Sequence, residues 1–421
     1  MIAKSVYRAA TGEAPEDRGA ARRFATHIGA LVCTKTADGL IDPKLVLAWL
    51  LGALGAPGYL IGALVPVREA GALLPQLGLA RAIEARRVRK PFWIAGSAVQ
   101  GAAALGMAAA ALTLTGAAAG WAILACLAVL ATARAACSAS YKDILSRTVE
   151  KGLRGKTSGV AGTVGAAAVF AFAIMLSVEI IPREPLYVAG AVALAGALWL
   201  LAAAIFATLD EPEAEDADAD RRSLSTLVEP LKRDGEFRLY VAVRALLIST
   251  ALAPPFLVML GGQSQDAGFA NLGILILASS LAAIASSYLW GALSDRSSRK
   301  TLAVAGAAAA FALGGAAAMG FATGGLGPAW IAGIFVFAAQ IAYQGARAGR
   351  KTHLTDMDAE GRTAVYTALS NTMIGALLLV GGVFGVIADM AGAEVALALL
   401  ASLAGFGAVA ALGLSEVQDE S

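Results

Sequence analysis

Long apolar stretches recur along the whole chain and are separated by short polar connections. Residues 92–131, 186–209, 301–342 and 373–414 hold almost no charge. About twenty apolar residues in a helix span the roughly 30 Å hydrocarbon core of a bilayer. Backbone polar groups inside lipid must be satisfied within the segment, which favours helices, and the alternating pattern of a membrane barrel is absent. The chain is therefore predicted to be an all-α, multi-pass membrane protein.

The apolar pattern predicts twelve transmembrane helices. They cover residues 22–43, 57–80, 92–115, 118–140, 155–180, 185–208, 236–260, 268–292, 301–323, 328–348, 362–388 and 393–414. The first helix has the weakest hydropathy because residues 34–44 are polar. The following apolar run, 45–56, is assigned to the external connection, where it can form an interfacial helix. Hydropathy alone also permits a span at 45–67.

Composition and charge placement set the membrane topology. Charged residues make up 15% of the chain, well below the roughly 25% of soluble proteins. Lys and Arg concentrate on one side of the predicted helices, in loops such as 86–90, 142–156 and 296–300, whereas the opposite loops hold essentially Lys44 and Arg183. The positive-inside rule then places both termini in the cytoplasm, and we expect a bacterial inner-membrane protein.

An internal repeat organises these helices into two halves. Shifting the chain by 210 residues superimposes 83–96 on 293–306, so that the basic residues of the two loops coincide. We predict an N-terminal six-helix half at 1–208, a cytoplasmic linker at 209–235 and a C-terminal half at 236–421. Two parallel six-helix repeats with a long linker are an architecture of secondary transporters.

A loop motif gives this architecture a family resemblance. Residues 291–300 read GALSDRSSRK, which resembles the major facilitator signature G-x-x-x-D-R-x-G-R-K. The matching residues are Gly291, Asp295, Arg296, Arg299 and Lys300. The resemblance implies two pseudo-symmetric six-helix bundles and a gate in which Asp295 binds the positive end of the fifth helix. Alternatively, these charges only anchor a cytoplasmic turn. The first-half copy departs from the signature, with Arg81 for the glycine and Ala85 for the aspartate, although Glu84 is adjacent.

A second, partial match lies in the fourth helix. Leu130 and Arg134 in LATARAACS resemble the family pattern L-x-x-x-R-x-x-Q-G, with Cys137 and Ser138 in place of Gln and Gly. The resemblance implies proton coupling by Arg134. Snorkelling of this side chain to the cytoplasmic boundary is an equal alternative.

Buried charges provide the candidate binding site. Lys35 and Asp38 fall near mid-depth of the first helix, and Arg68 and Glu69 fall at a similar depth of the second. A charge at the bilayer centre costs about 2.5–3.5 kcal/mol on insertion scales, so pairing or function is expected. We predict that these four side chains face a central cavity and bind solute or protons. A static ion-pair network, or shifted spans that leave Lys35 and Asp38 at an interface, are the alternatives.

The second half contributes polar rather than charged candidates. Gln340 and Tyr343 share a face of the tenth helix, and Asn371 lies in the eleventh. These side chains are candidate substrate ligands, or interhelical hydrogen-bond partners. Arg244 and Arg347 lie closer to the cytoplasm and are expected to snorkel.

Other functional classes find no support in the sequence. The chain lacks a phosphate-binding G-x-x-x-x-G-K-[ST] loop, and its two histidines and three cysteines have no metal-ligand spacing, so neither enzymatic activity nor a cofactor is expected. We predict a monomeric secondary transporter for a small polar or amphipathic solute, coupled to protons and surrounded by lipid, with no nucleic-acid partner. A non-transporting assembly factor or receptor on the same fold is the alternative.

Overall fold

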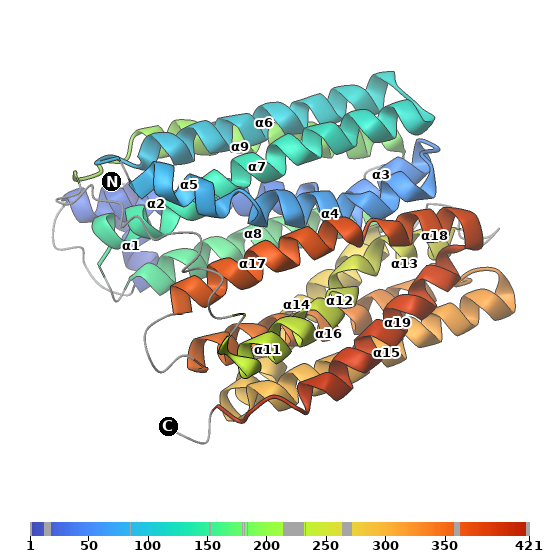
Figure 1. The fold of residues 1–421 in the computed structure, drawn as a ribbon. Coiled ribbons are helices and arrows are strands. Elements are labelled where there is room, and N and C mark those ends of the chain that lie inside the picture. Colours follow the sequence, from blue (N-terminus) through green and yellow to red (C-terminus); the bar gives the residue numbers. More distant parts are fainter. Residues whose placement is uncertain are drawn as a thin grey trace.

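The computed structural model describes residues 2–11, 18–84, 86–150, 153–178, 180, 182, 184–213, 231, 233–262, 272–357 and 363–417. The described residues form helices joined by short turns, arranged as two groups that lie one above the other in Figure 1. The first group contains α1 (Ile2–Thr11), α2 (Arg18–Leu40), α3 (Val46–Ala53), α4 (Gly58–Leu73), α5 (Gln76–Glu84), α6 (Lys90–Thr113), α7 (Gly116–Thr148), α8 (Arg154–Ser177) and α9 (Pro185–Ala207). The second contains α11 (Gly235–Leu246), α12 (Ser249–Leu252), α13 (Pro254–Gly262), α14 (Leu272–Arg296), α15 (Ser298–Thr323), α16 (Ala329–Asp356), α17 (Thr363–Val380), α18 (Val383–Ala391) and α19 (Ala393–Ala411).

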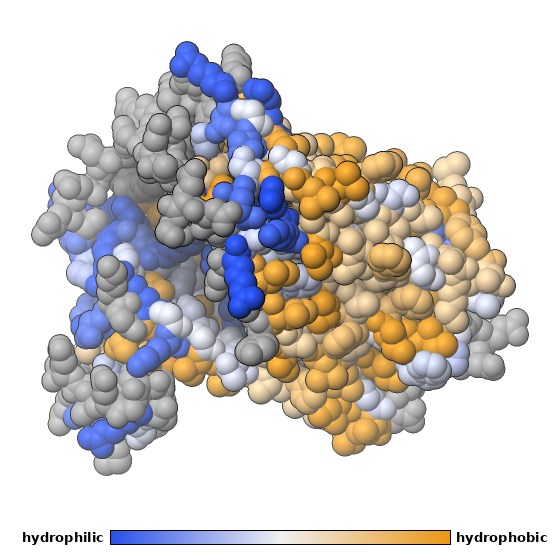
Figure 2. Space-filling model, turned by 90° about the horizontal axis from the view of Figure 1, so that it is seen from below, coloured by the Kyte–Doolittle hydropathy of each residue, from blue (hydrophilic) through white to orange (hydrophobic). Residues whose placement is uncertain are grey.

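Nine helical segments of the described chain are long and apolar enough to cross a membrane. The segments α2, α4 and α14 are not among them: α2 carries Lys35 and Asp38, α4 is short and carries Arg68 and Glu69, and the apolar part of α14 is shorter, at Leu272–Ser286. The all-α, multi-pass class is thus confirmed, whereas the count of twelve spans stays a prediction. Figure 2 shows the surface expected of such a protein: hydrophilic residues gather at the end that carries the termini, and most of the remaining face is hydrophobic.

Helix packing follows the same pattern in the two groups. In the first, α6 packs on α7 and α9; in the second, α15 packs on α16 and α19. Small residues permit this approach: a Cβ placed on Gly101 of α6 would lie 2.8 Å from the carbonyl oxygen of Gly196 in α9. Close backbone contact of this kind supplies the packing energy that apolar burial cannot supply in lipid. Residues 214–230 of the predicted linker lie outside the described residues, and the domain boundaries stay a prediction.

The two groups meet along three main contacts. Helix α4 packs against α17 and α18, α8 packs against α14, and the short α3 packs against α13. At the end opposite the termini, the backbone N–H of Gly58 donates to Asp389 Oδ1 at 2.8 Å. One turn further along α4, Gly62 faces the backbone of Gly385 so closely that a side chain at either position would collide with it. The groups are therefore in tight contact at this end.

Candidate functional site

The first predicted span is broken in its middle. Helix α2 ends at Leu40 and α3 begins at Val46. Pro43 has no N–H and disfavours helical backbone at the preceding residue, so the helix stops before it. The Asp42 carboxylate caps the break by accepting the N–H groups of Lys44, at 2.8 Å, and Leu45, at 3.0 Å.

The break changes two expectations about this region. The run at 45–56 is not an interfacial helix in the external connection. Its helical part, α3, is buried from Val46 to Leu51 and packs against α4, α7, α9, α13 and α14. Lys44 likewise lies in the interior rather than at the outer interface, and it is 8% exposed. The large apolar side chains of α3 are buried more completely between helices than they would be at a membrane surface, which favours the interior position.

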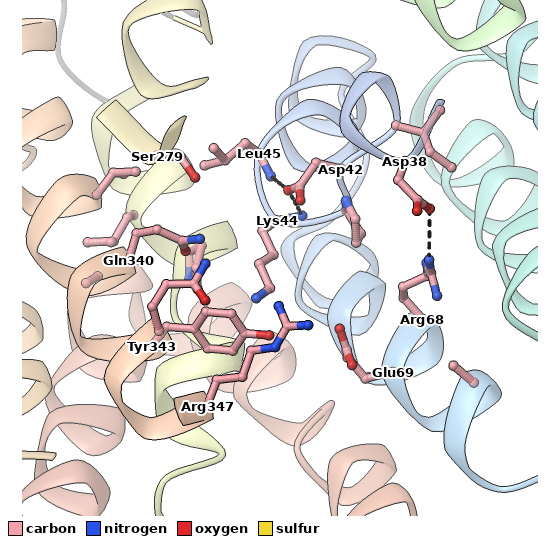
Figure 3. A pocket seen from close by; sticks show the side chains of 18 of the residues that line it. Asp38, Asp42, Lys44, Leu45, Arg68, Glu69, Ser279, Gln340, Tyr343 and Arg347 are labelled. Atoms are coloured by element: carbon pink, nitrogen blue, oxygen red, sulfur yellow. Dashed lines mark hydrogen bonds and ion pairs between the residues drawn. The ribbon is translucent and has the colours of Figure 1, made fainter. Parts of the chain in front are cut away.

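A cavity of about 360 Å³ lies beside the break, between α2, α4, α14 and α16 (Figure 3). Its charged and polar lining consists of Asp38, Asp42, Lys44, Arg68, Glu69, Arg134, Ser279, Gln340, Tyr343, Gln344, Arg347 and Arg350. The Lys44 ammonium lies 3.4 Å from the centroid of the Tyr343 ring, which forms a cation–π contact between the two helix groups. The predicted Gln340 and Tyr343 therefore face the cavity together.

On the side of the first group, Asp38 binds two arginines. Arg68 Nη2 lies 3.5 Å from Asp38 Oδ1, and Arg134 forms an ion pair with the same oxygen. Arg134 therefore points to the cavity and does not snorkel. Glu69 lies within electrostatic range of Lys44, Arg68, Arg134 and Arg350, but it forms no salt bridge with a residue that the structure describes. Asp38, Arg68 and Glu69 thus come together as predicted, and Arg134 joins them.

Lys35 lies away from this group. Its side chain is exposed, and it lines a separate cavity of about 160 Å³ with Trp93, Gln100 and Tyr141, which touches Asp38 and Arg134 from the other side. No described carboxylate forms a salt bridge with Lys35. The fourth charge of the predicted set is supplied instead by Lys44, which sequence reasoning placed at the membrane surface.

An adjoining cavity of about 250 Å³ shares Glu69, Tyr343, Arg347 and Arg350 with the first and extends to Arg244 and Asn371. Arg244 is 8% exposed. Its guanidinium donates to Ser370 Oγ at 2.7 Å and to Asn371 Oδ1 at 2.8 Å. The expectation that Arg244 snorkels is wrong, because Ser370 and Asn371 hold it in the interior. Arg347 is exposed and lines both cavities. Asn371 acts in the described structure as a partner of Arg244.

The loop motif forms contacts at the end that carries the termini. Arg299 Nε lies 3.2 Å from Glu416 Oε2, which also accepts a hydrogen bond from Ser297 Oγ at 2.6 Å. Arg296 and Lys300 are exposed. The structure describes only the backbone at Gly291 and Asp295, and Ala85 and the side chains of Arg81 and Glu84 lie outside the described part. The predicted latch therefore stays a prediction.

Sequence reasoning missed one carboxylate in each repeat. Glu211 follows α9, and both its oxygens accept the N–H of Arg89 at 3.1 Å, while Oε2 also accepts the N–H of Lys90 at 2.7 Å. Glu416 follows α19 and holds the equivalent start of α15. The short matches LDE at 209–211 and LSE at 414–416 were the available signal. Each carboxylate lies at the positive end of the third helix of its half.

Comparisons with known proteins agree with this architecture. Residues 29–373 match the family model described as Major Facilitator Superfamily. No curated protein matches the chain. Among solved structures, a POT family transporter in complex with a thioalcohol-conjugated peptide has a TM-score of 0.70 at 11% identity, covering 93% of this chain and 95% of that one.

Two further solved structures show the same fold. A point mutant of the nucleoside transporter NupG has a TM-score of 0.66 at 13% identity, covering 93% of this chain and all (100%) of the other. A point mutant of the fucose:proton symporter FucP of E. coli has a TM-score of 0.54 at 16% identity, covering 93% of this chain and 99% of the other. At these identities the likeness concerns the fold.

Proposed function

Because this chain belongs to the Major Facilitator Superfamily, whose solved relatives of the same fold are transporters, we propose that it is a proton-coupled secondary transporter. It moves a small polar solute across a bacterial cytoplasmic membrane by alternating access. The one-sided basic loops support cytoplasmic termini. The observation that carries the proposal is the charged cavity of about 360 Å³ beside the break in the first span.

The size of this cavity suits a solute site, since ligand sites occupy roughly 300–1,000 Å³. Charged and polar side chains predominate in its lining, which suits a polar solute better than an apolar one. Transporters place such sites near the membrane midplane, where a discontinuous helix exposes its ends. Here the break between α2 and α3 brings Asp42 and Lys44 to the cavity wall. A static ion-pair network would explain the Asp38 cluster but not the volume beside it.

The contacts between the helix groups support alternating access. At the end opposite the termini, Gly62 and Gly385 meet with no side chains between them. Gly273 of α14 packs against the side chain and backbone of Ser177 in α8. The two cavities extend from this closed end along α16 as far as Arg350. We assign this arrangement to a state closed on the outer side. The Gly62–Gly385 contact has no interlocking side chains, so separation of the groups there requires the hydrogen bond from Gly58 to Asp389 to break.

Glu69 is the proposed proton carrier. Asp38 is paired with two arginines and Asp42 accepts two backbone N–H groups, whereas Glu69 forms neither a salt bridge nor a hydrogen bond with a described residue. Lys44, Arg68, Arg134 and Arg350 lie within electrostatic range of it. Protonation removes one negative charge from this group of cations. The affinity of the surrounding cations for the solute then changes, which links proton binding to solute binding.

The test uses purified protein in proteoliposomes with an imposed pH gradient. Labelled sugars, amino acids, carboxylates and nucleosides are offered as substrates, and the Glu69→Gln variant is compared with the wild type. We expect Glu69→Gln to lose gradient-driven accumulation while retaining exchange of labelled for unlabelled solute. Glu213→Gln is the matched control, since the Glu213 carboxylate is 69% exposed in a surface pair with Arg87.

Two outcomes count against the proposal in different ways. Unchanged gradient-driven uptake by a folded Glu69→Gln protein removes Glu69 from coupling but leaves transport intact. A folded wild-type protein that moves no solute in either assay favours the assembly-factor or receptor alternative.

A further inference from the structure

The charges that face the two adjoining cavities are unequal. Among the residues that the structure describes, six cationic side chains face three carboxylates. The cations are Lys44, Arg68, Arg134, Arg244, Arg347 and Arg350, and the carboxylates are Asp38, Asp42 and Glu69. Three positive charges therefore have no compensating charge in the lining. Arg347 is exposed and Arg350 is partly exposed, so a negatively charged solute that enters the cavity can reach these charges.

All three carboxylates belong to the first helix group, and two of them are engaged. Asp38 is shared by Arg68 and Arg134. Asp42 Oδ1 accepts the backbone N–H groups of Lys44 and Leu45 at the helix break. Glu69 alone remains to oppose the cations that come from the other group.

The opposite wall, on α11 and α16, is cationic without a carboxylate among its described lining residues. Arg347 and Arg350 are three residues apart on one face of α16, and neither forms a salt bridge with a described residue. Arg244 is bound by the neutral Ser370 and Asn371, so its charge is solvated but not cancelled. In Figure 3 the Arg347 guanidinium lies beside the Tyr343 ring, with the Lys44 ammonium close by.

We propose that the solute is a small organic anion whose carboxylate or phosphate group binds between Arg347, Arg350 and Lys44. The inference rests on the proposed transport function and names its substrate class. Guanidinium groups match both oxyanions with two parallel hydrogen bonds, and the Gln340 and Gln344 amides beside them serve the uncharged part of the solute. Lys44 lies within range of both Glu69 and the anion, so the two compete for it.

This competition gives the coupling a direction. Lys44 is within electrostatic range of Glu69. An ionised Glu69 attracts the Lys44 ammonium, whereas a protonated Glu69 leaves this ammonium to the anion. Proton and anion therefore bind together, which makes the solute and the proton move in the same direction. A solute with a net positive charge would instead add to the three uncompensated charges and be repelled.

The test compares anionic solutes with uncharged counterparts of related structure, and adds one cation. The thermal unfolding midpoint of the full-length protein in detergent is measured with glucose 6-phosphate against glucose, succinate against succinamide, and lysine as a cation, at constant ionic strength. We expect that glucose 6-phosphate or succinate raises the unfolding midpoint and that the neutral counterpart of the active anion does not. An effect of glucose 6-phosphate indicates a phosphate site, and an effect of succinate indicates a carboxylate site.

Variants locate the binding group. Arg347→Gln with Arg350→Gln should raise the Kd of the stabilising anion roughly tenfold or more, because the charged hydrogen bonds of both guanidinium groups are lost. Arg86→Gln, an exposed arginine in the 86–90 loop, is the matched control and should leave the Kd unchanged. Without ligand, the thermal unfolding midpoint of the double variant must lie within a few degrees of the wild-type midpoint. If it does not, Arg347→Lys and Arg350→Lys are used instead, because lysine keeps the charge but cannot bind an oxyanion with two parallel hydrogen bonds.

The outcomes are separable from those of the transport proposal. The anion inference is overturned if only glucose, succinamide or lysine stabilises the protein. It is also overturned if no anion has an effect, or if the arginine variants bind the anion as well as the wild type does. Flux of a neutral or cationic solute in proteoliposomes would keep the transporter while refuting the substrate class.

Discussion

Replacing Asp38 by asparagine tests how the charges of the cavity support one another. The carboxylate is shared by two guanidinium groups, with Arg68 Nη2 at 3.5 Å and Arg134 paired to the same oxygen. Asp38→Asn keeps the shape of the side chain but leaves the two arginines facing each other. Removing one partner of a buried ion pair costs about 3–5 kcal/mol.

The structure places the expected loss at the lower end of that range. The Arg68, Asp38 and Arg134 side chains are 12%, 21% and 33% exposed to the cavities, so water screens part of the repulsion. We expect Asp38→Asn to lower the free energy of unfolding by about 3 kcal/mol. Adding Arg134→Gln should recover at least about 1 kcal/mol of the lost unfolding free energy. The substitution removes the like-charged neighbour of Arg68, which still has the Glu69 carboxylate close by.

The assay is reversible unfolding of the four proteins of this double-mutant cycle in mixed micelles. Asp42→Asn is the control: its carboxylate accepts two backbone N–H groups and pairs with no described guanidinium, so a loss of about 1 kcal/mol is expected, as for a helix cap. A loss for Asp38→Asn no larger than for Asp42→Asn would refute the reasoning. So would strict additivity of the Asp38 and Arg134 substitutions.

The remaining predictions concern three other contacts. Gly62→Val places a branched side chain against the backbone of Gly385 and should hold the closed end open, which is measured as faster alkylation of a cysteine introduced nearby. Unchanged labelling contradicts this prediction. The control is Gly78→Val, because a side chain at Gly78 meets open space. Lys44→Gln removes the cation–π contact with Tyr343 and should lower the unfolding free energy by about 1–2 kcal/mol, whereas Lys44→Arg should retain most of it; equal losses would argue against a cation–π contribution. Glu211→Gln weakens the cap on the third helix and should cost about 1 kcal/mol in the same unfolding assay, and a loss below the experimental error would remove that role.

Much of the architecture was predictable because it depends on spacing alone. Apolar length selects membrane helices, and the facing of Gln340 and Tyr343 follows from their three-residue separation on one helix. The same reasoning predicted Asp38, Arg68 and Glu69 at one depth, and the structure places all three on the lining of one cavity. These inferences need only a regular rise per residue, which a continuous helix provides.

The errors arose where the backbone or the side-chain direction is set by tertiary contacts. Depth counted along a continuous helix put Lys44 at the membrane surface, but the break at Pro43 returns it to the cavity. Distance from the cytoplasmic boundary suggested snorkelling for Arg244, yet Ser370 and Asn371 hold it inward. Depth does not specify direction when a polar partner lies on a neighbouring helix.

The break in the first span also explains why its weak hydropathy is tolerated. The polar segment at 41–45 adds no lipid-facing surface, because the apolar α3 beyond it is buried between both helix groups. Lys44 stands at the junction and reaches across to Tyr343 of the second group. In the proposed alternating access, separation of the two groups at this position would lengthen or break this contact, which is worth about 1–2 kcal/mol. A solute anion that draws Lys44 away supplies a compensating interaction of similar size, so the residue that links the two groups is also the residue through which solute binding can release them.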